Sequence, residues 1–285
     1  MKRWLAMWIS LAAALPLIAA ADTNTTLSEI LAERPLAKVT KATDLIGRDV
    51  RDAAGEKFGD VNDVALDLET GRILYAVVSM DGERESADRL IAVPAGLLAT
   101  RENYLVLKAD KSKLTSAPAF DEKTSLSPEF VSNLNKDFRA DSSTGANING
   151  NALKNIQLAK SVFGMPVLDS SNGRAGEVKD LALDWNSERI PFVIISPAGV
   201  LKLSAVWYPV PPGALKTGNG KSLSLTVTGE QFVAAPQFRP GDWANLSDLQ
   251  WAKQVYTFYR TPGYFETALQ PTGRTNALER IYHEP

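Results

Sequence analysis

The stretch that decides the fold is GDVNDVALD at residues 59–67, which returns as GEVKDLALD at residues 176–184. The two stretches lie 117 positions apart, and at this offset Gly47–Ser79 aligns with Gly164–Ser196 without a gap, with twelve of 33 positions identical. Chance at average composition gives about two identities. The chain therefore contains a duplicated unit. Its shared frame includes Gly47, Gly59, Asp63, Asp67, Pro94, Gly164, Gly176, Asp180, Asp184 and Pro211.

Each copy of the unit has the pattern of short β-strands. Apolar and acidic residues mix within Val61–Leu68, as in half-buried strands, and Ile73–Val78 is rich in β-branched and aromatic residues. The intervening Glu69–Arg72 is typical of a hairpin turn, and Arg89–Val93 and Tyr104–Leu107 add further strands. About five short strands without a long amphipathic helix predict a mainly β fold, a small barrel or sandwich in each copy.

These motifs resemble the PRC-barrel family. The family pattern is an apolar-Gly-x-x-Val opening, a Gly-x-Val-x-Asp strand, an apolar strand and a Val-Pro step. Copy one carries these motifs in order at Leu45–Val50, Gly59–Asp67, Ile73–Ser79 and Val93-Pro94, and copy two repeats them. The resemblance implies two tandem small antiparallel PRC-type β-barrels with short flanking helices. It also implies protein or ribonucleoprotein contacts, and no catalytic constellation.

The N-terminus predicts export. Lys2 and Arg3 precede an apolar run, Trp4–Ala20, and small residues then lead into a polar stretch. The run is at the short limit for a membrane anchor, which is the alternative interpretation. We expect a signal peptide at residues 1–21, cleavage near Ala21, a periplasmic location and no membrane span after cleavage.

Changes in composition divide the remainder of the chain. The predicted boundaries are an N-terminal segment at 22–35, repeat one at 36–120, a helix and flexible linker at 121–152, repeat two at 153–238, and a C-terminal helix and tail at 239–285. Ser127 and Pro128 are typical of a helix start, and that helix is expected to reach Phe138. Ser247 and Gln250 predict a capping box for the C-terminal helix.

The composition removes several classes of function. The chain has no cysteine, which rules out disulfides and thiolate chemistry, and its formal net charge of −2 gives no basis for nucleic-acid binding. The sequence contains no Gly-x-Ser-x-Gly nucleophile motif for which the single histidine, His283, could act as general base. We therefore expect no catalytic site, no cofactor and no metal.

The repeated aspartates leave two interpretations open. Asp63 and Asp67 are four residues apart in a strand, which places their side chains roughly 13 Å apart, too far for one metal ion. We interpret them, with Asp180 and Asp184, as acceptors for backbone N–H groups at turns, and the frame glycines as turn or bulge positions. The alternative is a small-ligand or metal-ion sensor, or an enzyme, that uses a cleft between the barrels. The acidic segment Asp81–Asp88 matches no calcium-loop pattern.

The two copies differ most in surface chemistry. Ile73–Leu98 contains six charged residues, whereas the aligned Ile190–Leu215 contains one. The surplus of apolar residues in copy two needs burial, either by the other barrel or the C-terminal helix, or by a partner or second subunit. The candidate contact residues are Trp207, Tyr208, Val206, Leu203, Trp251 and Tyr256. The resulting hypothesis is a non-catalytic periplasmic binding or scaffolding protein that contacts an unknown protein or associates with itself.

Overall fold

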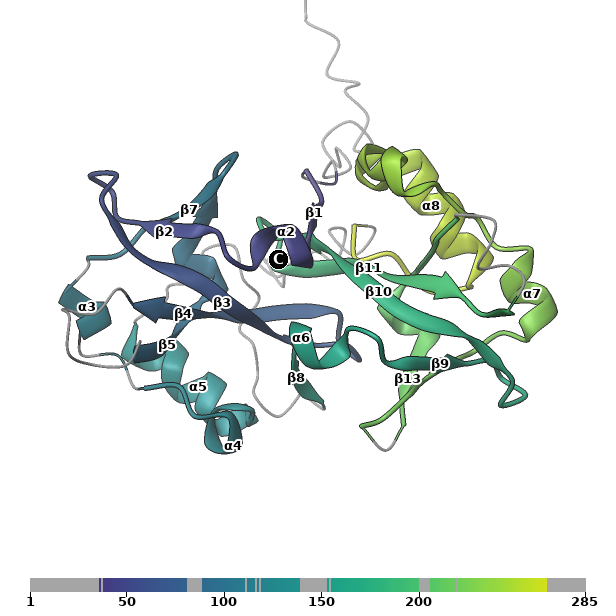
Figure 1. The fold of residues 1–285 in the computed structure, drawn as a ribbon, viewed down its shortest axis with the longest axis horizontal. Helices are drawn as coiled ribbons and strands as arrows, with labels where there is room; N and C mark the ends of the chain where they lie inside the picture. Colours follow the sequence, from purple (N-terminus) through teal and green to yellow (C-terminus); the bar gives the residue numbers. More distant parts are fainter. Residues whose placement is uncertain are drawn as a thin grey trace, which may run out of the picture. The chain divides into compact units, whose positions relative to one another are not determined.

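The computed structural model describes residues 36–265 except 37, 81–88, 111, 116, 118, 139–152, 154, 200–205 and 219. The predicted signal peptide, most of the predicted linker and the C-terminal tail lie outside the described residues, as do Leu203, His283 and the acidic segment Asp81–Asp88. The described residues belong to one compact unit. They are mainly β with few helices, as the sequence predicted (Figure 1).

Repeat one folds into short strands and turns that match the predicted strand positions. Its elements are β1 (Thr40–Lys41), α2 (Ala42–Leu45), β2 (Asp49–Arg51), β3 (Lys57–Asp67), β4 (Arg72–Met80), β5 (Arg89–Pro94), the 3-10 helix η1 (Ala95–Leu97), β6 (Leu98–Thr100), β7 (Tyr104–Leu107) and α3 (Ser112–Thr115). Two helices follow it, α4 (Glu122–Ser125) and α5 (Pro128–Asp137). The predicted hairpin turn joins β3 to β4, which pair antiparallel along most of their length.

Repeat two has the same order of elements. They are β8 (Ile156–Leu158), α6 (Ala159–Val162), β9 (Pro166–Leu168), β10 (Arg174–Asp184), β11 (Arg189–Pro197), β12 (Tyr208–Val210), η4 (Pro212–Ala214), β13 (Leu215–Thr217) and β14 (Leu223–Leu225). They are followed by α7 (Gly229–Val233), η5 (Pro240–Ser247) and α8 (Leu249–Phe258). The pairing also recurs: β2 is antiparallel to β3 and parallel to β7, and β9 is antiparallel to β10 and parallel to β14.

The glycines of the shared frame have two different roles. Gly47 and Gly164 have φ of +89° and +75°, which confirms the predicted turn positions. Gly59 and Gly176 lie where two strand backbones approach closely. A Cβ added at Gly59 would lie 2.2 Å from the carbonyl oxygen of Ser79, and one at Gly176 would lie 2.2 Å from that of Ser196. Only glycine therefore fits at these two strand positions.

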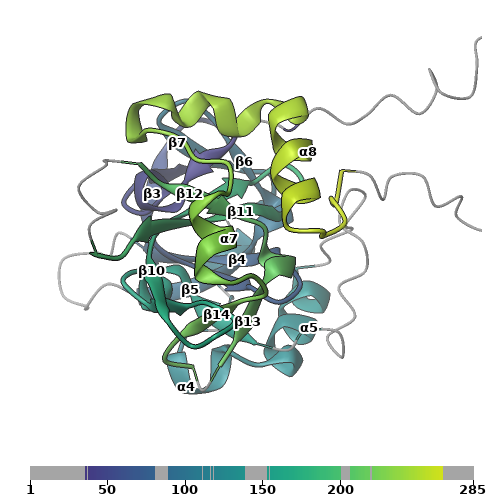
Figure 2. The ribbon, with the colours of Figure 1, turned by 90° about the vertical axis from the view of Figure 1, so that its right-hand side faces the viewer.

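One helix covers the central strand of each repeat. In repeat one, Phe130 of α5 packs edge-on against Tyr75 of β4, with ring centroids 5.7 Å apart. In repeat two, Trp251 of α8 packs in the same way against Phe192 of β11, at 6.1 Å. Tyr75 and Phe192 occupy equivalent positions at the offset of 117. The rings of Tyr75 and Phe192 on which these helices pack are buried, and Figures 1 and 2 show where α5 and α8 lie.

The start of α5 was predicted correctly, and the start of α8 was not. The Ser127 hydroxyl accepts a hydrogen bond from the N–H of Phe130 at 3.2 Å, as an N-cap does. The predicted capping box at Ser247 is wrong, because Asp248 caps α8 by accepting from the N–H of Trp251 at 2.8 Å. The Ser247 hydroxyl instead accepts from the N–H of Val39 at 3.0 Å, far away in sequence.

The strands of both repeats belong to one sheet. Its main path runs β13-β14-β9-β10-β11-β4-β3-β2-β7-β6, and β4 meets β11 where Arg72 lies opposite Arg189. The first strand of each repeat leaves its own repeat: β1 pairs with β10, and β8 pairs with β3. Figure 1 shows the result, with α2 beside β10 and α6 beside β3.

Candidate functional site

The surplus aromatic residues of repeat two form a cluster with the C-terminal elements. Phe238 stands at its centre, with ring centroids 6.1 Å from Trp207, 5.9 Å from Trp243 and 6.3 Å from Trp251, all edge-on. Backbone hydrogen bonds in both directions tie Trp207 to Phe238. At these described residues the apolar surface of repeat two is covered by its own chain, one of the two alternatives that the sequence left open.

The five predicted contact residues that the structure describes do not lie together on one surface. Tyr208 is only 1 % exposed and stacks on Phe232 at 4.5 Å. Tyr256 is 5 % exposed, and its hydroxyl donates to the carbonyl of Pro191 at 2.9 Å. These two side chains are part of the core, where aromatic rings with a satisfied or enclosed hydroxyl stabilise the fold. Three others, Val206, Trp207 and Trp251, are partly exposed beside the cluster, and Leu203 lies outside the described residues.

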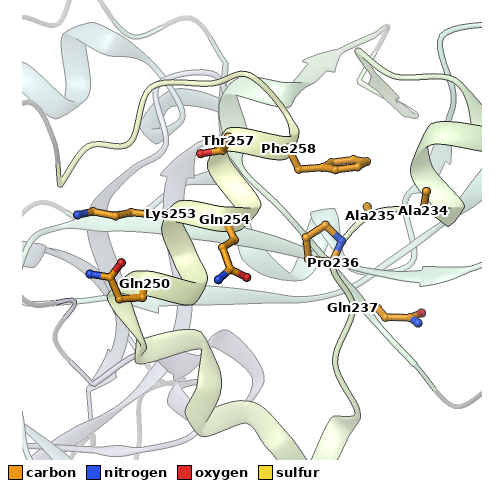
Figure 3. A pocket seen from close by; sticks show the side chains of 9 residues that line it. All are labelled: Ala234, Ala235, Pro236, Gln237, Gln250, Lys253, Gln254, Thr257 and Phe258. Atoms are coloured by element: carbon orange, nitrogen blue, oxygen red, sulfur yellow. The ribbon is translucent and has the colours of Figure 1, made fainter.

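A groove runs along the outer side of α8, next to this cluster (Figure 3). Its volume is about 620 Å³. One wall is the segment 234–237, which follows α7, and the other is a stripe of α8 residues at helical spacing of three and four. Its lining consists of Ala234, Ala235, Pro236, Gln237, Gln250, Lys253, Gln254, Thr257 and Phe258.

The groove offers hydrogen bonds around an apolar floor. Gln237, Gln250 and Gln254 can each donate and accept through their amides, while Pro236 and Phe258 supply apolar surface. Ligand and peptide sites combine these two properties. The sequence did not predict the groove because no single lining residue is unusual. It arises only where the segment after α7 meets α8.

Two of the repeated aspartates join the repeats. Asp63 Oδ1 accepts from the N–H of Val64 at 2.7 Å and from the N–H of Lys160, at the start of α6, at 3.2 Å. Asp180 Oδ1 accepts from Leu181 at 2.8 Å and from Thr43, at the start of α2, at 3.2 Å. Burial raises the pKa of both carboxyls, against the opposing effect of these hydrogen bonds. The prediction that these aspartates accept from backbone N–H groups is confirmed, but the predicted turn position is wrong for Asp63 and Asp180, which lie within β3 and β10 and bond across the repeats.

The other two aspartates hold turns, as predicted. Asp67 accepts from the N–H groups of Glu69 and Thr70 at 2.9 and 3.2 Å in the β3–β4 turn. Asp184 accepts from Ser187 at 3.2 Å in the equivalent turn, and also from the Tyr264 hydroxyl at 2.9 Å. Their acceptor capacity is used in holding the backbone, which is the role of aspartate in such turns.

The alternative of a metal-ion sensor requires several metal-ligating side chains that lie close together. In the described ranges, no three or more His, Cys, Asp or Glu side chains are placed to hold a metal ion. In the same ranges, none of the helices has the length and apolar character needed to cross a membrane. Glu188 is the remaining buried carboxyl near the join of β4 and β11, where burial raises its pKa and Arg72, Lys108 and Arg189 oppose that rise.

Comparison with known proteins identifies part of the chain. Residues 38–114 match the family model of the PRC-barrel domain, which covers repeat one from β1 to α3. No curated protein matches the chain. The resemblance drawn from the repeated motifs is therefore correct for this region.

Proposed function

We propose that this chain, whose residues 38–114 are a PRC-barrel domain, is a non-catalytic binding or scaffolding protein that contacts another protein through its C-terminal surface. Two further proposals belong to it. Residues 153–238 form a second barrel of the same type, and residues 1–21 direct export to the periplasm. A single observation carries the proposal of a contact surface, the groove between α8 and segment 234–237.

The proposal of a second barrel rests on the recurrence of elements and pairings. Every strand and turn of repeat one from β1 to β7 has a counterpart in repeat two, with the same antiparallel and parallel neighbours. Residues with positive φ also recur at the offset of 117, Gly55 with Asn172 and Gly71 with Glu188. Such agreement in backbone conformation extends well beyond the identical residues.

The chemistry of the groove supports contact with a protein segment. A peptide presents N–H and C=O groups along its backbone, and the three glutamine amides can pair with both kinds. Partly exposed Trp251 follows Gln250 of the groove directly in sequence, and its ring contacts Phe238, the residue after Gln237 of the groove. Tryptophan contributes more than its share to protein–protein binding energy. The polar stripe of α8 therefore lies beside aromatic groups that can anchor a partner.

The experiment compares two matched arginine variants. Gln254 lies in the groove, and Asn133 is the exposed residue of α5 at the position equivalent to it, counted from the two N-caps. Mature protein carrying Gln254→Arg or Asn133→Arg is used for pull-down and cross-linking from the periplasmic fraction, where the mature N-terminus is also sequenced. We expect an N-terminus near Asp22, and a captured protein that Gln254→Arg loses by at least tenfold and Asn133→Arg retains. Equal capture by both variants, or no captured protein, would contradict the proposal.

A further inference from the structure

The two repeats contact each other through equivalent residues, beginning with their exchanged first strands. In the β1–β10 pair, Thr40 lies opposite Leu183 and Lys41 lies opposite Ala182. In the β8–β3 pair, Gln157 lies opposite Leu66 and Leu158 lies opposite Ala65. The second set is the first set with the roles of the repeats reversed at the offset of 117. Each repeat thus completes the sheet of the other with the same strand.

The hydrogen bonds at the short helices are reciprocal too. Asp180 of repeat two accepts from the backbone of Thr43 at the start of α2, and Asp63 of repeat one accepts from the backbone of Lys160 at the start of α6. Thr43 and Lys160 are equivalent positions, and so are the two aspartates. Asp180 also accepts from the Thr43 hydroxyl, whereas the equivalent Lys160 has no hydroxyl.

The same relation holds where β4 meets β11. The N–H of Ile73 donates to the carbonyl of Glu188 at 3.0 Å, and the N–H of Ile190 donates to the carbonyl of Gly71 at 3.0 Å. Arg72 and Arg189, which are equivalent, lie directly opposite each other. A contact in which residue i meets j and the equivalent of j meets the equivalent of i is the isologous interface of a twofold dimer.

We infer that this contact, the cross-repeat face, is a docking surface through which repeat one also binds repeat two of a second copy of this chain. We define the cross-repeat face as residues 40–45 and 63–73 of repeat one with residues 157–162 and 180–190 of repeat two. Every bond across it joins residues that two separate chains also possess. Two chains can therefore exchange repeats and form a dimer with the same contacts that the single chain makes internally.

Two hydrogen bonds between the repeats involve residues whose equivalents differ in the other repeat, and these bonds determine which repeats pair. The indole N–H of Trp185 donates to the carbonyl of Leu98 at 3.1 Å, and the hydroxyl of Thr217 bonds to the carboxylate of Glu69. The position equivalent to Trp185 holds Leu68, which has no N–H to donate, and the position equivalent to Glu69 holds Asn186, which accepts hydrogen bonds but carries no charge. Repeat one of one chain is therefore expected to pair with repeat two of the other chain, rather than with another repeat one.

The experiment uses the absence of cysteine from the chain. Directly opposed residues of antiparallel strands have Cα atoms about 4.5–5.5 Å apart, within the range of a disulfide. Mature chains carrying Lys41→Cys and mature chains carrying Ala182→Cys are mixed, unfolded and refolded together at increasing concentration, then oxidised. We expect a disulfide-linked dimer whose ratio to monomer rises about tenfold for each tenfold increase in chain concentration.

Two controls make the result decisive. Lys41→Cys chains mixed with chains carrying Cys at the exposed position Gln254 should give at least tenfold less linked dimer. Size-exclusion chromatography with light scattering on the refolded wild-type chain gives the dimer fraction without any substitution. Linked dimer at the level of the Gln254→Cys control, or a wild-type chain that refolds only to monomer at every concentration, would overturn the inference. Chains that carry both Lys41→Cys and Ala65→Cys have both cysteines in repeat one, and they report pairing between two copies of repeat one. If these chains alone give as much linked dimer as the mixture of Lys41→Cys and Ala182→Cys chains, the selection of unlike repeats is overturned.

Discussion

Single aspartates divide between local turns and the contact between repeats. Asp67 and Asp184 bond within their own turns, and their role could be predicted because acceptor and donor lie two or three residues apart. Asp63 bonds to a residue 97 positions away, and Asp180 to one 137 positions away. No local pattern in the sequence indicates such bonds. The repetition of these aspartates was visible, but the reason for it lies in the fold.

Replacement of Asp63 by alanine and by asparagine distinguishes the effect of its hydrogen bonds on stability from the effect of its charge. Asp63→Ala leaves one buried and one partly buried N–H group without this acceptor, which should lower the free energy of unfolding by about 1–3 kcal/mol. Asp63→Asn keeps one oxygen for both bonds, since both reach Oδ1. We expect the asparagine variant to be close to the wild type in urea unfolding. Equal losses in the two variants would show that charge, not hydrogen bonding, holds α6 in place.

The pH dependence of the same two proteins follows from the raised pKa. Because burial raises the pKa of Asp63 above its ordinary value of 3.8, the folded protein binds this proton more readily than the unfolded chain. The stability that protonation of the Asp63 carboxyl contributes is fully present below pH 3.8 and is lost as pH rises through the raised pKa. Stability measured relative to Asp63→Asn should therefore fall with rising pH in this window. A relative stability that rises instead would contradict the pKa shift.

At the scale of elements, the helices α5 and α8 occupy equivalent places in the two repeats. Ser127 and Asp248 cap α5 and α8, and three residues later Phe130 and Trp251 pack on the equivalent rings of Tyr75 and Phe192. The sequence predicted α5 from Ser127 and Pro128, and it predicted a helix at α8 from Ser247 and Gln250, although Asp248 is the actual cap. It did not show that they are equivalent, because the two segments share almost no identical residues. Only the common packing partner reveals the relation.

Truncation of Trp251 tests whether α8 stabilises repeat two by covering β11. Trp251→Ala removes ring contacts to both Phe192 and Phe238 and should lower the free energy of unfolding by about 2–4 kcal/mol. Gln254→Ala changes an exposed residue one turn away and should stay within about 0.5 kcal/mol of the wild type. Urea unfolding followed by far-UV circular dichroism measures both. A small loss for Trp251→Ala would mean that α8 adds little to the core.

At the scale of the whole molecule, the two repeats form one reciprocally joined unit. The duplication, the β class and the short strands could be predicted, because they depend on local pattern and on residues that repeat. The exchange of β1 and β8, the bonds from Asp63 and Asp180, and the groove beside α8 could not be predicted. Each depends on segments that meet only in the folded chain.

The most direct test of this joining places the perturbation in one repeat and the probe in the other. Without residues 1–21, the tryptophans of the chain are Trp185, Trp207, Trp243 and Trp251, which all lie in or after repeat two. Gly59→Ala drives a methyl group into the Ser79 carbonyl of repeat one and should cost about 1–3 kcal/mol. Gly241→Ala, where an added Cβ meets nothing within 4 Å, is the control.

The measurement is urea unfolding of the Gly59→Ala protein, followed both by tryptophan fluorescence and by far-UV circular dichroism. If the repeats unfold together, the fluorescence midpoint falls by the same amount as the dichroism midpoint, and the Gly241→Ala protein shows no change. If the fluorescence midpoint stays at the wild-type value while dichroism reports an additional early transition, the repeats unfold independently, and the reciprocal joining of the two halves is refuted.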